Sequence, residues 1–394
     1  MESNKLSPKI NITNLSDILN GDSKYIPIKR IKSYIFPDNL SNFILYDYNT
    51  NKIINKISSS DNYFIFSINK IMINNISYLI ISSSEKINKS LINYNNLLFR
   101  IKDKALKKEE NSLIKCLEEE IHKVIILDNK DVVALRNREY ISYYIYNNSN
   151  YKKFFNNLNK DGYIFGLIKL TKNNFCFLSL KSLDTFKFTL FDENFFSKEK
   201  EIKMMKPSIN IKNNIFFKVN KGKIIIIGNF EFIIFDPILL EIQTIINTGL
   251  ICGVLPFNKR NNDYNEIYHY FALIILENKH FYIKFYSFFD YIKETEKMDL
   301  NQLYPEFEKL IFDNNSSNVH KQEKNRNEKK EYKNIYFHII KENKEYYMES
   351  ILFDMFYDVK NNGDIILIID IIRGSGEKKL KFSLDFNINN LLFM

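Results

Sequence analysis

An apolar or aromatic run that ends in Asp or Asn recurs along this chain of 394 residues. Between the terminal residues Asp103, Asn147, Asp192 and Asp236 the step is constant at about 44 residues. A fixed period of about 40–45 residues predicts repeated supersecondary units that stack on one another. Seven such runs are present: Phe43–Asp47, Leu97–Asp103, Tyr140–Asn147, Phe186–Asp192, Phe232–Asp236, Tyr282–Asp290 and Leu380–Asp385.

The stretch Lys223–Phe257 shows the repeated unit most clearly. Gly228-Asn229, Asp236-Pro237 and Thr248-Gly249 divide it into short runs rich in Ile, Phe and Leu. Such runs, separated by Gly, Pro, Asn and Asp, predict strands joined by tight turns. In phase with its neighbours, the stretch is predicted to form three strands of one sheet and the inner strand of the next.

Four strands per period predict an all-β fold, namely a seven-bladed β-propeller of four-stranded antiparallel blades. A small sheet cannot bury both of its faces alone, and radial stacking of such sheets solves that problem. The alternative is another all-β assembly, such as two β-sandwiches, for which a regular period is not expected. Six or eight blades are also possible, because the last step between runs is much longer.

The predicted third strands resemble those of the WD-repeat β-propeller family, in which this strand ends in Trp-Asp, Phe-Asp or Tyr-Asp. The matching pairs here are Tyr46-Asp47, Phe191-Asp192, Phe235-Asp236 and Phe289-Asp290. Residues 112–147, with His122, resemble a whole unit of that family. The chain has no tryptophan and no Gly-His pair, so the resemblance rests on pattern. It covers the chain from about Ile26 onward and implies a propeller.

The predicted domain organisation is a tail followed by one propeller. Residues 1–24 are polar and are expected to form an N-terminal tail with at most one closing strand, and residues 25–394 to form the propeller. Residues 313–334 contain almost nothing apolar and predict a disordered insertion loop, because such a segment cannot offset the entropy of its own ordering.

Residues 104–122 fit two descriptions. Leu106, Leu113, Leu117 and Ile121 lie on one face of a predicted helix, and the Lys and Glu residues between them favour that state. Alternatively, Ser112–Leu117 is a strand followed by a loop. The phase of the repeat favours the strand.

The charge and the cysteines limit the classes of protein to consider. The formal net charge of +9 can indicate a nucleic-acid partner, but the basic residues are dispersed and the Lys enrichment matches a general compositional bias. Cys116, Cys176 and Cys252 form no metal-binding or redox motif and predict free thiols in a reducing compartment. The N-terminus lacks the features of a signal peptide, so the expected localisation is cytoplasmic, or else nuclear.

No residue is predicted to be catalytic or to bind a cofactor or metal. The histidines, which are His122, His269, His280, His320 and His338, lack a ligand partner at a metal-binding spacing. His269 and His280 flank one predicted hairpin and could face each other, but are interpreted as strand-end residues. Phosphate-binding glycine motifs are absent. Arg373-Gly374 is interpreted as part of a hairpin turn and not as a lipid-binding motif.

The leading functional hypothesis is a non-enzymatic protein-interaction scaffold, a propeller subunit of a larger intracellular complex. Propellers combine a rigid core with variable loops, so this hypothesis rests on analogy between folds. The first alternative is an RNA-associated propeller that binds through a basic face. The second is an enzyme with its site at the central channel. The binding residues and the partner cannot be inferred from the sequence.

Overall fold

A computed structural model describes residues 26–28, 33–38, 42–47, 52–58, 63–74, 76–86, 92–102, 105–117, 120–136, 138–155, 163–182, 184–205, 215–258, 267–278, 280–303, 350–359, 365–375 and 378–387. The chain divides into two compact units. Unit 1 comprises Met1–Ser16, Met205–Asp236 and Glu241–Met394, and unit 2 comprises Asp17–Met204 and Pro237–Leu240.

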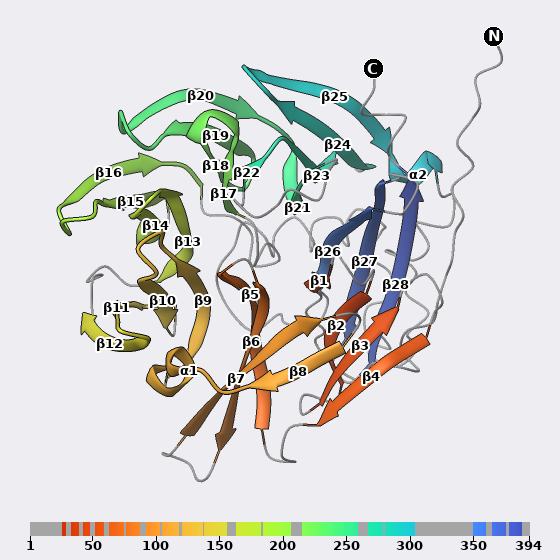
Figure 1. Cartoon of the computed structure of the whole chain (residues 1–394). Coiled ribbons are helices and arrows are strands. Elements are labelled where there is room, and N and C mark those ends of the chain that lie inside the picture. Colours follow the sequence, from red (N-terminus) through yellow and green to blue (C-terminus); the bar gives the residue numbers. More distant parts are fainter. Residues whose placement is uncertain are drawn as a thin grey trace. The chain divides into compact units, whose positions relative to one another are not determined.

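The described part of unit 2 contains four antiparallel sheets, each built from four consecutive strands (Figure 1). Its strands are β1 (Ile26–Ile28), β2 (Ser33–Asp38), β3 (Asn42–Asp47), β4 (Lys52–Ser58), β5 (Tyr63–Ile73), β6 (Ile76–Lys86), β7 (Ile92–Lys102), β8 (Ala105–Glu109), β9 (Ile121–Ile126), β10 (Val132–Arg136), β11 (Tyr140–Asn147), β12 (Asn150–Phe155), β13 (Ile164–Thr171), β14 (Asn174–Ser182), β15 (Thr185–Phe191) and β16 (Ser197–Lys203). The short helix α1 (Ser112–Cys116) joins the second and third sheets.

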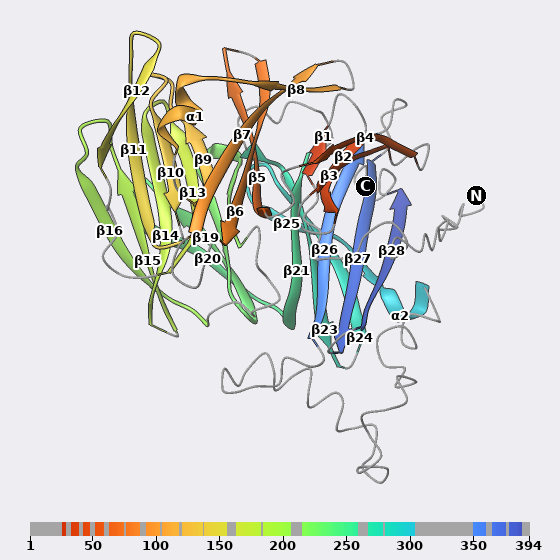
Figure 2. The ribbon, with the colours of Figure 1, turned by 90° about the horizontal axis from the view of Figure 1, so that it is seen from below.

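Unit 1 contains three further sheets, with β26, β27 and β28 side by side in the last of them (Figure 2). The first sheet consists of β17 (Phe216–Val219), β18 (Ile224–Ile227), β19 (Glu231–Asp236), β20 (Glu241–Asn247) and β22 (Ile267–Tyr268); the second of β21 (Leu250–Phe257), β23 (Tyr270–Glu277), β24 (His280–Phe288) and β25 (Ile292–Asp299); the third of β26 (Ser350–Val359), β27 (Ile365–Ser375) and β28 (Lys378–Asn387). A 3₁₀ turn, η2 (Asn220–Gly222), follows β17, and α2 (Leu300–Leu303) follows β25.

The predicted repeat is confirmed strand by strand. The described part of each of the seven runs lies in the third strand of its sheet or directly after it, and these third strands are β3, β7, β11, β15, β19, β24 and β28. Within the units, first strands of successive sheets are in contact, β5 with β9, β9 with β13, and β21 with β26. Four-stranded antiparallel sheets stacked in chain order make a propeller-like all-β fold. Closure of seven blades into one ring stays a prediction.

The stretch Lys223–Phe257 folds as its turns predict. β18, β19 and β20 are consecutive strands of one sheet, and β21 is the first strand of the next. All four residues of β18 and all eight of β21 are buried, whereas most of β20 is exposed. Continuous apolar runs therefore mark strands that are covered on both faces.

The expectation of a strand at Ser112–Leu117 is wrong. Strand β8 ends at Glu109, and Ser112–Cys116 forms α1. The side chain of Asn111 accepts a hydrogen bond from the backbone N–H of Leu113 at 2.9 Å, as an N-terminal cap does, and Leu113 is fully buried. The Lys- and Glu-rich residues 105–109, and not the residues after them, supply the fourth strand that the repeat requires.

The core of unit 2 lies between its sheets. Val132 and Ala134 on β10 face a cluster with Ile80, whereas the alternating residues Val133 and Leu135 face a second cluster with Phe177. Successive strand side chains point to opposite faces, so one strand contributes to both layers. Full burial of such aliphatic side chains stabilises the fold by about 1.5–3 kcal/mol each.

Several expectations fall on residues that the structure does not describe. These are the tail at residues 1–24, the insertion at residues 313–334, and the histidines His320 and His338. Among the described residues, no helix has the length and apolar character that crossing a membrane requires.

Candidate functional site

Ionisable and aromatic side chains from several strands of unit 2 meet where β9 begins and β10 ends. Glu120 directly precedes β9, and its Oε1 lies 2.7 Å from Nε2 of His122 on that strand. Tyr94 of β7 also forms a hydrogen bond with the Glu120 carboxylate. Because Arg136 pairs with both Ile121 and Tyr140 in the sheet, the β10–β11 turn lies at the same end.

Arg138 in the β10–β11 turn contacts the start of β13 through both its backbone and its side chain. The Arg138 carbonyl accepts a hydrogen bond from the Ile164 N–H at 2.6 Å, and its guanidinium donates to the Tyr163 hydroxyl at 2.9 Å. The guanidinium carbon also lies 5.5 Å from the centre of the Tyr163 ring. Arg138 has a φ of 54°, a left-handed conformation that costs a non-glycine residue about 1–2 kcal/mol. The hydrogen bonds of its carbonyl and guanidinium help to offset this cost and direct the side chain toward Tyr163.

Hydrogen bonds first, and neighbouring charges second, favour the ionised form of Glu120. The hydrogen bond from His122 lowers the pKa of Glu120, helped by Tyr94 and the charge of Arg138 and opposed by burial. Burial and the adjacent Glu120 raise the pKa of Tyr94. Burial lowers the pKa of Arg136. Glu120 is thus an ionised hydrogen-bond acceptor that several donors surround. Such a group positions its neighbours and has no proton to donate as an acid.

We define the Arg138 surface as the seven residues Tyr94, Glu120, His122, Arg136, Arg138, Tyr140 and Tyr163. Tyr140 is 36% exposed and Tyr163 is 42% exposed, whereas the side chains of Glu120 and His122 are largely covered. Tyrosine and arginine presented on a rigid support are the residue types that dominate binding energy at protein interfaces. The exposed part of the Arg138 surface therefore has the residue types that protein contact surfaces favour.

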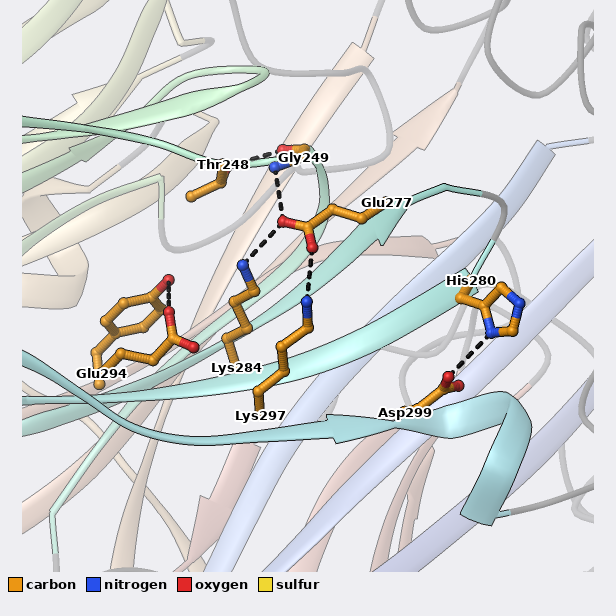
Figure 3. A network of polar contacts seen from close by, with 9 residues as sticks. Thr248, Gly249, Glu277, His280, Lys284, Glu294, Lys297 and Asp299 are labelled. Atoms are coloured by element: carbon orange, nitrogen blue, oxygen red, sulfur yellow. Dashed lines mark hydrogen bonds and ion pairs between the residues drawn. The ribbon is translucent and has the colours of Figure 1, made fainter.

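A second polar network lies on the β21–β25 sheet of unit 1 (Figure 3). The Glu277 carboxylate accepts hydrogen bonds from Lys284 Nζ at 2.8 Å, Lys297 Nζ at 2.8 Å and the Gly249 N–H at 3.2 Å. Burial raises its pKa, but the two lysine hydrogen bonds outweigh this and hold the pKa at about 2. Through these hydrogen bonds the Glu277 carboxylate links β23 to side chains on β24 and β25.

The same network extends along β24 and β25. Lys297 Nζ lies 3.9 Å from the centre of the Tyr282 ring, which stacks on the His280 ring. His280 Nδ1 is 2.9 Å from Asp299, whose other oxygen accepts the N–H of Asn301 at the start of α2 (Figure 3). These contacts connect charged side chains to each other and to the backbone, so we assign the network a structural role.

The histidines and cysteines can be placed individually. His269 precedes β23 and His280 begins β24, so they lie at opposite ends of the hairpin, and the suggestion that they could face each other is wrong. No disulfide joins the three cysteines; Cys176 and Cys252 are buried and Cys116 is half-buried. Among the described residues, no group of three or more His, Cys, Asp or Glu side chains is arranged to hold a metal ion.

The Arg138 surface was not predicted from the sequence. Arg138 and Tyr163 are separated by a whole strand pair, and they meet only because the β10–β11 turn bonds to the first residue of β13. The available signal was the pair Arg136 and Arg138, at and just after the end of β10, between two apolar strands. Arginine in a turn is ordinarily solvated, so this signal alone did not identify a site.

Comparison with known proteins supports the fold and names no family. No protein-family profile matches the chain, and no curated protein matches it by sequence. Among solved structures, Raptor from Chaetomium thermophilum is similar over 94% of this chain, with a TM-score of 0.50 and 11% identity, and the chain spans 28% of the length of that protein. At this identity the likeness shows a shared fold alone.

Two other solved structures are similar at a lower level. A chain of the mitotic checkpoint complex matches 97% of this chain and is covered over 96% of its own length, with a TM-score of 0.49 and 5% identity. Dihydro-heme d1 dehydrogenase NirN in complex with DHE matches 95% of this chain and is covered over 69%, with a TM-score of 0.48 and 10% identity.

Proposed function

We propose that this chain is a non-enzymatic protein-interaction scaffold, a subunit of a larger intracellular complex, and that the Arg138 surface contacts a partner protein. The observation that carries the proposal is the pinned pair of Arg138 and Tyr163, with Tyr140 exposed beside it. Side chains already held in place lose little conformational freedom on binding, so more of the contact energy appears as affinity.

The propeller-like fold supports the same proposal by analogy. Its core is built by strand pairing, while turns such as the one carrying Arg138 can vary without loss of the sheet. Glu120 fits this role because it forms hydrogen bonds with His122 and Tyr94 and so connects the less exposed residues of the Arg138 surface.

Affinity purification with matched variants tests this function. Tagged wild-type chain, Arg138→Ala, Tyr163→Ala and the control Lys198→Ala, on exposed β16, are compared by quantitative mass spectrometry. We expect a defined set of proteins to be recovered with the wild type and the control, and to fall by about tenfold with Arg138→Ala, as loss of an interface hot spot predicts. Equal recovery with all four chains, each folded by circular dichroism, would refute the proposal.

RNA binding through a basic face is the weaker alternative. On the β13–β16 sheet, lysines alternate with glutamates along β16; Lys187 Nζ lies 2.9 Å from Glu199, and Lys181 pairs with Glu201. Alternating positive and negative side chains produce little net positive potential to attract a phosphate backbone. Fluorescence anisotropy with a labelled single-stranded RNA at low and physiological salt separates the two functions, because RNA binding should weaken steeply as salt rises.

A further inference from the structure

The fourth strands of the sheets differ in one respect. In five sheets this strand lies at the sheet edge and carries two or more lysines: β4, β8, β12, β16 and β25. Lysine on an edge strand discourages pairing with another chain, because the added strand would cover its charge. Strand β20, with the sequence EIQTIIN, has neither lysine nor arginine. Among the described fourth strands, it alone lacks this protection.

Strand β20 is also exposed and apolar. It pairs with β19 on one side, and no described strand pairs with its other side. Ile242 is 38% exposed and Ile245 is 50% exposed. The register places Ile245 opposite Ile233 and Ile242 opposite Phe235, so the two exposed isoleucines share one face. A short β-branched segment with a single charge has the composition of strands that pair between chains.

We propose that β20 pairs with β20 of a second copy of this chain and so forms a symmetric dimer. Its single charged residue, Glu241, is at one end of the strand, so antiparallel pairing places the two carboxylates at opposite ends of the pair. No like charges are then opposed, and the paired strands bring the exposed isoleucines of both copies together. An open sheet edge supplies main-chain hydrogen bonds for the added strand.

Sedimentation velocity of the purified full-length chain over a range of concentrations tests the dimer. We expect a reversible monomer–dimer equilibrium for the wild type. Thr244→Lys and Ile245→Lys each place on β20 a lysine like those of the other edge strands. Each should raise the dimer dissociation constant by roughly tenfold or more. The matched control is Ser197→Lys, which adds a lysine to exposed β16 and should leave the equilibrium unchanged.

Hydrogen exchange gives a second readout that does not depend on a variant. Amide protection at residues 241–247 should increase with protein concentration, while protection along β16 should not. A wild-type chain that stays monomeric at all concentrations overturns the proposal, and so does a dimer that persists unchanged in both lysine variants. Loss of partner proteins from Arg138→Ala would not alter these results, so the dimer and the scaffold function can fail separately.

Discussion

At the scale of single residues, Gly249 and Glu277 depend on each other. A Cβ atom at position 249 would lie 2.3 Å from Cγ of Glu277, 2.5 Å from the Leu276 carbonyl oxygen and 2.8 Å from Cγ2 of Ile275. All three atoms belong to β23, and one of them is a backbone atom, so they cannot all move aside easily. The close approach is also what allows the Gly249 N–H to donate to the Glu277 carboxylate.

Replacing Gly249 with Ala should therefore destabilise unit 1 by about 1–3 kcal/mol, the usual cost of overpacking. Denaturant unfolding followed by tyrosine fluorescence measures the change in the free energy of unfolding. Gly222→Ala is an informative comparison, because Gly222 has no atom within 4 Å of a Cβ but a φ of +70°. Its cost should come from backbone strain alone, about 1–2 kcal/mol. A Gly249→Ala chain as stable as the wild type would contradict the described packing.

The pH dependence of stability should report the protonation of Glu277. Its pKa is lowered from 4.5 to about 2 in the folded chain, so its contribution is fully present above pH 4.5 and is lost as the pH falls through about 2. Free energies of unfolding measured between pH 6 and pH 2 should decrease in this window. In Glu277→Gln that decrease should be smaller, and an identical slope in both chains would show that Glu277 does not titrate as inferred.

At the scale of an element, Asp131 fixes the β9–β10 hairpin to the strand that follows it. Its carboxylate accepts hydrogen bonds from the Tyr143 hydroxyl at 2.6 Å, the Asn129 amide at 2.7 Å and the Tyr146 N–H at 2.7 Å. Asp131 is buried, and burial together with its charge raises the pKa of Tyr143. One carboxylate thus joins the turn and two positions of β11.

Removing this carboxylate should be costly, because buried donors are then left without an acceptor. We expect Asp131→Ala to lower the free energy of unfolding by about 3 kcal/mol, whereas Asp131→Asn, which retains one acceptor oxygen, should lose less. Thermal and denaturant unfolding of the two variants provide the comparison. If alanine and asparagine cost the same small amount, the hydrogen bonds to Asp131 are not a main source of stability in this hairpin.

Elements were predictable wherever the chain repeats a pattern. The third strands were predicted because each coincides with an apolar run that ends in Asp or Asn. The strands of Lys223–Phe257 were predicted because Gly, Pro and Asn mark the turns between them. Helix α1 was not predictable in this way, because the composition of its segment allows both helix and strand. The Asn111 cap marks the start of the helix in the structure. The contact of Arg138 with Tyr163 could not be predicted either, since it depends on how two sheets pack.

At the scale of the whole molecule, two cysteines report on the two units separately. Cys176 is fully buried in unit 2, and Cys252 is buried in unit 1, where burial raises its pKa to about 12. A thiol with so high a pKa and no access to solvent reacts slowly with alkylating reagents.

Native labelling with iodoacetamide should therefore modify at most Cys116, and the other two should react only when their own unit opens. Peptide mass spectrometry across a denaturant series gives one unfolding curve for each cysteine. Coincident curves would indicate that the two units unfold together, and separate curves that they unfold independently. Rapid labelling of Cys252 in the native chain would contradict its described burial.

Strand β22 adds a constraint on the order in which the chain is assembled. It pairs in parallel with β17, through Lys218 with Ile267 and Val219 with Tyr268, although it lies between β21 and β23, which belong to the next sheet. During synthesis, β17–β20 therefore leave the ribosome before the strand that completes their sheet. The four antiparallel strands can pair first, but the parallel contacts at the edge of β17 form only after β21 has emerged, so the last contacts of this sheet depend on the chain of the next one.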